Sequence, residues 1–209
     1  MEANMSITSK VDLCNMALGR LGNYGTVSNI DIPSNDKEII CALWYDISRQ
    51  SFIKMTMPNF AIARKLVSQV VETPPYPFAY SYEYPSDCLK VLGIGAVEDK
   101  RNDYTIENNR IYTDVLYEDG LPLRYIKDFT DVSLMSPEFK IGFSWYLAGN
   151  IALEVTQDLD KVQLIEKILP EKLSTLSGLN AQENMPIRIS RSKFKAARRN
   201  GNPASENKR

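Results

Sequence analysis

Apolar residues near the start of the chain recur every three or four positions, the spacing of one buried face of a helix. In residues 10–21 these positions hold Val11, Cys14, Leu18 and Leu21. Ser9 just before them is a good N-cap residue, and Gly22 just after them is a natural helix end because glycine adopts a positive φ easily. We therefore predict a first helix over residues 10–21, followed by a polar loop.

A second helix is predicted over residues 36–57. Asn35 can cap its first turn, where the acidic Asp36 and Glu38 suit the positive end of the helix dipole. Pro58 marks its end. Its apolar positions are Ile40, Leu43, Trp44, Ile47 and Met55. We expect these side chains to form the buried face of the helix.

A third helix is predicted to begin at Ser136, because a capping residue followed by Pro137 is a strong helix start. Helical spacing then continues to residue 156. The small residues Gly149 and Ala152 would allow another helix to approach this one closely.

The fourth helix is predicted over residues 159–179. Its apolar positions are Leu159, Val162, Ile165, Leu169, Leu173 and Leu176. Pro170 lies inside it and is expected to kink or split it, because proline cannot donate a backbone hydrogen bond. After residue 180 the sequence is polar and has no helical spacing, so we expect an extended tail.

Between the second and third helices the spacing changes to that of strands. Short alternating runs occupy residues 60–66, 78–84, 89–95, 104–113 and 121–129. Asn108 and Asn109 mark a hairpin turn, because asparagine tolerates a positive φ. Asp87 is interpreted as a turn residue whose carboxylate bonds to nearby backbone. These runs predict a small antiparallel sheet.

The predicted fold class is therefore α+β. We expect a four-helix core with a small antiparallel β-domain inserted between helices 2 and 3, plus an extended C-terminal tail. The predicted boundaries are residues 1–57 and 136–180 for the two halves of the helical core, 58–135 for the β-domain and 181–209 for the basic tail. A length of 209 residues suits one domain with such an insert.

The composition argues against catalysis. The chain has no histidine, so it lacks the most common general base and the most common zinc ligand. Its three cysteines, Cys14, Cys41 and Cys88, are far apart and are interpreted as buried, reduced thiols. Without a phosphate-binding loop or an inward-facing carboxylate cluster, the sequence predicts no enzyme, no cofactor and no metal site. It also shows neither a signal peptide nor an apolar run long enough for a membrane span.

Charge is distributed unevenly along the chain. Residues 186–209 carry eight basic residues and one acid, a net charge of +7, whereas residues 1–185 carry a net charge of −8. The candidate docking residues of the tail are Ile187, Arg188, Ile189, Arg191, Lys193, Phe194, Lys195, Arg198 and Arg199. Their apolar members favour docking onto a protein surface. A direct nucleic-acid contact and a merely solubilising terminus are the alternatives.

Four sequence patterns occur in an order that resembles one phage protein family. They are LCNMALGRLG at 13–22, ALWYDISRQSFIKMTMPNFAIARKL at 42–66, YSYEYPSDCLKVLGI at 80–94, and YTIENNRIYTD followed by LRYIKDFTDVSLMSPEFKIGFSWYLAGNIALEV within 104–155. With them the sequence resembles tail tubular protein A, the head-to-tail adaptor family of short-tailed phages. The resemblance spans residues 11–179 and leaves the basic tail unexplained.

The resemblance implies a structural virion protein at the head–tail junction, assembled in the host cytoplasm. In this family the adaptor is a helical bundle with a β-domain, and a twelvefold homo-oligomeric ring forms beneath the portal protein. The ring extends the DNA channel and docks further tail ring or nozzle proteins, while packaged DNA passes through without specific binding. The acidic body suits such a channel, because each phosphate contact by a basic residue would add affinity for DNA. The alternative is a nucleic-acid-binding module that acts through the basic tail.

Overall fold

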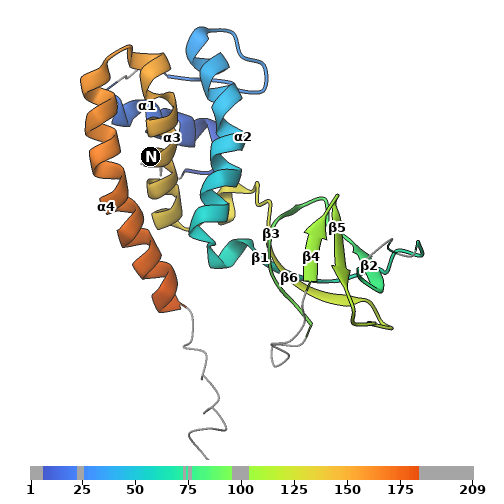
Figure 1. Ribbon diagram of the computed structural model, residues 1–209. Coiled ribbons are helices and arrows are strands. Elements are labelled where there is room, and N and C mark those ends of the chain that lie inside the picture. Colours follow the sequence, from blue (N-terminus) through green and yellow to red (C-terminus); the bar gives the residue numbers. More distant parts are fainter. Residues whose placement is uncertain (1–6, 23–25, 73, 75–76, 96–103, 184–209) are drawn as a thin grey trace, which may run out of the picture.

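The computed structural model describes residues 7–22, 26–72, 74, 77–95 and 104–183. Within these residues the chain forms four α-helices and two three-stranded antiparallel sheets, and both sheets lie between the second and third helices. The predicted α+β fold with a β-insert at this place is thus confirmed. Figure 1 shows the helices as a bundle, with the sheets beside one end of the second helix.

The helices begin where the local sequence predicts. They are α1 (Lys10–Arg20), α2 (Asp36–Thr56), α3 (Pro137–Thr156) and α4 (Leu159–Glu183), with short 3-10 helices η1 (Asn59–Ala61) and η2 (Val132–Leu134). Ser9 and Asp12 form a capping box, in which each side chain accepts the other residue's backbone N–H. Asn35 caps α2, and Ser136 caps α3 directly before Pro137.

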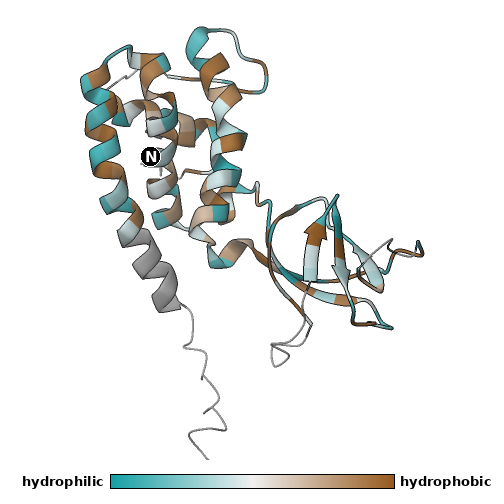
Figure 2. Ribbon diagram, in the orientation of Figure 1, coloured by the Kyte–Doolittle hydropathy of each residue, from teal (hydrophilic) through white to brown (hydrophobic). Residues whose placement is uncertain are grey.

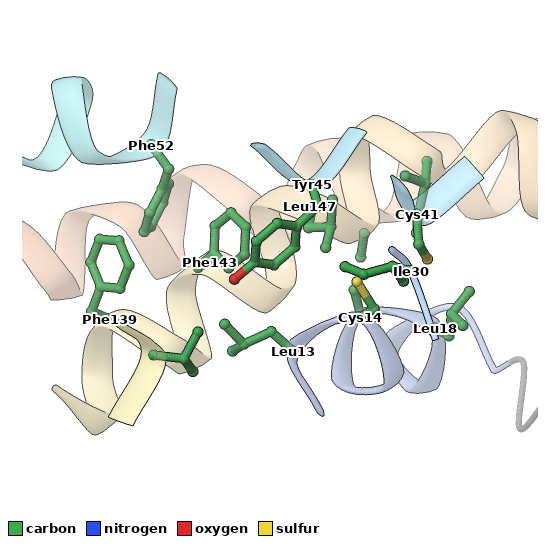
Figure 3. Close-up of a cluster of buried hydrophobic side chains, with 14 of the residues drawn as sticks. Leu13, Cys14, Leu18, Ile30, Cys41, Tyr45, Phe52, Phe139, Phe143 and Leu147 are labelled. Atoms are coloured by element: carbon green, nitrogen blue, oxygen red, sulfur yellow. The ribbon is translucent and has the colours of Figure 1, made fainter. Parts of the chain in front are cut away.

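One hydrophobic core joins the helices, and α3 lies at its centre in contact with the other three. Figure 3 shows part of this core, in which α1, α2 and α3 contribute Leu13, Cys14, Leu18, Cys41, Tyr45, Phe52, Phe139, Phe143 and Leu147. The rings of Phe52 and Phe139 lie 5.0 Å apart between centroids, and those of Tyr45 and Phe143 lie 5.6 Å apart. Each such buried side chain contributes roughly 1.5–3 kcal/mol to stability.

The buried face of α2 is not the predicted one. Its buried residues are Glu38, Cys41, Tyr45, Ser48, Arg49, Phe52 and Ile53. Of the predicted face, Leu43 is 63% exposed, Ile47 is 64% exposed and Met55 is 48% exposed, while Ile40 and Trp44 are half-buried. The prediction fails because polar side chains share the buried face, and two of them, Ser48 and Arg49, bond to residues far away in the sequence.

The close packing of α4 on α3 follows from the small residues of α3. Ala148 and Ala152 are fully buried. A Cβ atom added at Gly149 would lie 3.6 Å from Cγ2 of Ile165 and 3.8 Å from Cδ2 of Leu169, both on α4. The close helix approach predicted at this position is therefore confirmed.

Pro170 does not split the fourth helix, which was one of the two outcomes predicted for it. The helix is continuous over Leu159–Glu183 and ends later than the predicted residue 179. Pro170 is exposed, and the apolar residues Ile165 and Leu173 on either side of it pack against the core, which offsets the missing hydrogen bond. Leu159, predicted to face the core, is exposed. The side chain of Leu176 lies outside the described residues, as does the rest of the predicted tail from residue 184.

The described residues of the β-domain form six strands. They are β1 (Ile62–Val67), β2 (Tyr80–Glu83), β3 (Cys88–Ile94), β4 (Tyr104–Glu107), β5 (Arg110–Thr113) and β6 (Leu121–Lys127). The antiparallel pairing is as predicted, but the strands divide between a β1–β6–β3 sheet and a β2–β5–β4 sheet. Asn108 and Asn109 turn the β4–β5 hairpin with φ values of 46° and 60°, which confirms the predicted turn.

A second, smaller core lies within the β-domain. Its buried members include Val67, Tyr82, Ile111, Leu121, Leu123 and Tyr125. Asp87 stands in the predicted turn, where the Cys88 N–H donates to the Pro85 carbonyl over 2.9 Å. Its carboxylate, however, accepts from the Tyr125 hydroxyl at 3.2 Å rather than from neighbouring backbone. Asp87 thus links the turn to strand β6.

Candidate interaction surface

The predicted docking residues of the basic tail, at positions 187–199, lie outside the described residues. The described part of the chain carries a different candidate surface, on the outer side of α2. Ile39, Leu43, Ile47 and Met55 are all exposed there. We call these four residues the α2 stripe. Apolar positions along α2 are brown in Figure 2.

Ile39, Leu43 and Ile47 of the α2 stripe share one face of the helix, and Met55 lies further around it, at the C-terminal end of α2. Positions four residues apart are neighbours on a helix surface, and Ser51 occupies the one place in the series that is not apolar. Single exposed apolar side chains are ordinary on a protein surface, whereas a contiguous row of them is typical of an interaction site. The α2 stripe is therefore the strongest docking surface that the described helices offer.

The α2 stripe leads into a cleft between α2 and the β-domain. The cleft has a volume of about 720 Å³. Its lining includes Ile47 and Met55 from α2 and Tyr84, Leu89, Val91 and Ile106 from the β-domain. Lys54 and Lys90 also line it. A partner that covers the stripe would thus contact the helical core and the β-domain together.

Arg49 fixes the two walls of this cleft relative to each other. It is 2% exposed, and its Nη1 donates both to the Asp128 carboxylate and, over 2.8 Å, to the carbonyl of Phe129. Gln50 Nε2 also donates to Asp128, over 2.9 Å. Asp128 follows directly after β6, so these bonds hold the end of that strand against α2. The surface is therefore formed before any partner arrives, which lowers the cost of binding.

Polar contacts with α3 determine which side of α2 faces outward. Ser48 Oγ accepts from Asn150 Nδ2 over 2.9 Å. Trp44 Nε1 donates to the carboxylate of Glu154 over 3.1 Å. These bonds turn Ser48 and Trp44 toward α3, and the α2 stripe consequently points away from the core.

The loop before α2 is fixed by the carboxylate of Glu38, which is almost fully buried. Glu38 accepts from the backbone N–H and the hydroxyl of Ser28 at 2.9 and 2.8 Å, and from the same groups of Ser34 at 2.8 and 2.7 Å. These hydrogen bonds hold the pKa of Glu38 far below its usual value, because they favour the charged form. The loop also places Ile30 in the helical core. The start of α2 is thereby held in place.

The sequence pattern assigned three residues of the α2 stripe to the core, Leu43, Ile47 and Met55, so this surface was missed. A usable signal was present: α2 carries a second series of large side chains, Cys41, Tyr45 and Phe52, at helical spacing. A helix with two apolar faces in a small protein is expected to leave one of them open to a partner.

The prediction for the cysteines can be compared with the described residues. Cys14, Cys41 and Cys88 are all buried free thiols, as predicted. Across the described ranges, no three His, Cys, Asp or Glu side chains come together as a metal site would require. None of the described helices combines the length and the apolar character needed to cross a bilayer.

No model of a known protein family matches this chain, and no curated protein sequence matches it either. A function is therefore proposed below from the surfaces of the described residues and from the resemblance of the sequence patterns.

Proposed function

We propose that the protein is a structural virion protein, a head-to-tail connector of a short-tailed phage. It forms a ring beneath the portal protein, extends the DNA channel and docks the tail. The observation that carries this proposal is the exposed α2 stripe on a four-helix core whose β-domain lies between helices 2 and 3. This element order is the one that the family resemblance implies, and the stripe supplies the surface that a ring subunit needs.

In the proposed ring, neighbouring subunits cover the α2 stripe and the adjacent cleft. Full burial of one large apolar side chain contributes roughly 1.5–3 kcal/mol, so partial burial of four gives several kcal/mol. Association of free chains costs a similar amount in lost translational and rotational freedom. Repulsion between the acidic bodies opposes it further. The free protein is therefore expected to be monomeric or weakly associated, and the portal acts as the template for the ring.

The charge distribution supports a passive role toward DNA. Residues 1–185 carry a net charge of −8, which disfavours phosphate contacts by a channel that DNA must slide through. The basic tail, with Ile187, Ile189 and Phe194 among its charges, is proposed to dock onto a protein neighbour during assembly. The alternative, a nucleic-acid-binding module, would require the tail to bind DNA instead.

The test uses the portal-bearing heads of the phage that encodes the chain. Leu43→Glu and Ile47→Glu should abolish attachment of the ring while leaving the unfolding midpoint of the free protein nearly unchanged, because both side chains are already exposed. Leu164→Glu, which changes an exposed leucine on α4, is the matched control and should attach normally. Normal attachment of both stripe variants would contradict the proposal.

A second variant separates the alternative function. Deletion of residues 186–209 should weaken attachment to the heads if the tail docks onto protein. If the truncated chain attaches normally but no longer retains DNA, the nucleic-acid-binding module is the better reading.

A further inference from the structure

The three strands of the β1–β6–β3 sheet line a pocket that is separate from the α2 stripe and its cleft. It has a volume of about 460 Å³. Three cationic side chains line it: Arg64 and Lys65 from β1 and Arg124 from β6. Leu66 and Leu92 are among its apolar lining residues. We call it the arginine pocket.

The two arginines of the pocket are placed at an electrostatic cost. Arg64 and Arg124 are direct partners across β1 and β6, so their side chains share one face of the sheet, where like charges opposite each other are destabilising. None of the ion pairs among the described residues involves Arg64, Lys65 or Arg124. Moreover, Nε of Arg124 is buried without a hydrogen-bond partner. Such an arrangement indicates that an anion from outside the chain completes the site.

A glycine keeps the pocket open next to Arg124. Gly93 of β3 is the partner of Arg124 on the other side of β6, at a bulge in the strand pairing. A Cβ atom added at Gly93 would meet nothing within 4 Å. The space over Gly93, next to its cross-strand partner Arg124, is therefore open, and a larger side chain at position 93 would extend into it.

The lining indicates the chemistry of the ligand. The planar fork of a guanidinium matches a carboxylate, with which it forms two parallel hydrogen bonds. Because the pocket is also lined by apolar residues, it favours a ligand in which the carboxylate lies beside apolar side chains. Duplex DNA fits less well. Protein surfaces that bind DNA are polar and strongly basic, whereas residues 1–185 of this chain carry a net charge of −8. The favoured ligand is an acidic and apolar peptide segment.

The chain itself contains such a segment, in the loop between β5 and β6. Val115 and Leu116 are exposed there, and so are Glu118 and Asp119. The loop precedes β6, at the end of the β-domain far from the helices (Figure 1). The hydroxyl of Tyr82 holds it, because that oxygen donates to the Val115 carbonyl and accepts from the Tyr117 N–H, at 3.3 and 2.9 Å. The loop is thus already shaped for binding.

We propose that the loop of one copy, residues 114–119, inserts into the arginine pocket of a neighbouring copy. The carboxylates of Glu118 and Asp119 pair with Arg124 and Arg64, and Leu116 covers the apolar lining. The contact joins two different surfaces, so successive copies are related by a rotation and can close into a ring. That this contact helps to close a ring rests on the proposed connector function. Binding of the loop to the arginine pocket can be tested without a portal.

The test titrates the full-length protein into a fluorescein-labelled synthetic peptide of residues 113–120 and follows fluorescence anisotropy at low salt. The wild-type chain should bind the peptide, and Arg124→Gln should weaken binding about tenfold or more, as expected for a lost charge-assisted hydrogen bond. Gly93→Leu should also weaken binding, by filling the space beside Arg124. Lys167→Gln, on an exposed position of α4, removes the same charge elsewhere and should bind like wild type.

Several outcomes would overturn the proposal. They are the absence of binding by the wild-type chain, equal binding by the Arg124→Gln and Lys167→Gln chains, and undiminished binding of a peptide that carries Glu118→Gln and Asp119→Asn. Binding of a duplex oligonucleotide that is lost in Arg124→Gln would make the pocket a nucleic-acid site instead. If a Gly93→Leu chain still forms a normal ring on the portal, the proposed loop–pocket contact is wrong, but the connector function is not contradicted. If the chain binds the peptide but does not attach to the portal, the loop–pocket contact is supported and the connector function is contradicted.

Discussion

Replacing Arg49 by methionine should loosen the attachment of the β-domain to the helical core. Methionine keeps most of the apolar stem but removes the guanidinium that bonds to Asp128 and to the carbonyl of Phe129. Breaking a fully buried ion pair costs about 3–5 kcal/mol. Because the side chain of Asp128 is 24% exposed, water recovers part of this loss. We expect Arg49→Met to lower the free energy of unfolding by about 2–4 kcal/mol.

Asp46 provides the matched control for this substitution. It also accepts a hydrogen bond from Arg49, over 3.0 Å, but its side chain is 71% exposed. Asp46→Asn should therefore cost less than about 1 kcal/mol. Urea unfolding followed by circular dichroism gives both values. A cost for Arg49→Met no larger than that for Asp46→Asn would refute the conclusion that Arg49 holds the two parts together.

Three further predictions concern single positions. The pKa of Glu38 is lowered in the folded state, so its contribution to stability is present at neutral pH and is lost as the pH falls below the unfolded value of 4.5. The difference in unfolding free energy between wild type and Glu38→Gln, measured by urea unfolding, should therefore shrink over that range. A difference that stays constant would contradict this prediction. Asn109→Ala should cost roughly 1–2 kcal/mol in thermal unfolding because φ is 60° there, whereas Asn109→Gly should cost nothing. Gly149→Leu should cost roughly 1–3 kcal/mol by overpacking the α3–α4 contact, while Gly149→Ala, whose Cβ would make ordinary contacts, should be tolerated; equal stability of the two variants would count against the close packing.

The features that the sequence predicted well are those with local causes. The caps at Ser9, Asn35 and Ser136 and the hairpin at Asn108 and Asn109 all depend on residues within a few positions of one another. The chemistry that terminates a helix or turns a hairpin is contained in such short segments. Hence the order of elements and the fold class could be predicted.

The candidate surface could not be predicted in the same way. The inward face of α2 is set by Ser48 and Arg49, whose partners Asn150 and Asp128 lie far along the chain. Hydrophobic spacing cannot show that a buried arginine has hydrogen-bond partners. It therefore assigned to the core apolar residues of α2 that are in fact exposed.

The arginine pocket could not be predicted from the sequence for the same reason. Arg64 and Arg124 become neighbours only through the register of β1 against β6, a non-local property that a single sequence does not contain. The division of the strands into two sheets likewise depends on which strands pair, and strand spacing alone does not reveal this.

The most direct test of the proposed connector function is the mass of the purified chain, measured by native mass spectrometry with and without the portal protein that the proposal pairs with it. The account predicts a monomer or a weak oligomer for the chain alone, and a portal complex heavier by a full ring of chains, twelve if the family resemblance holds. A portal that gains no mass, or stable rings of the chain alone at micromolar concentration, would contradict it.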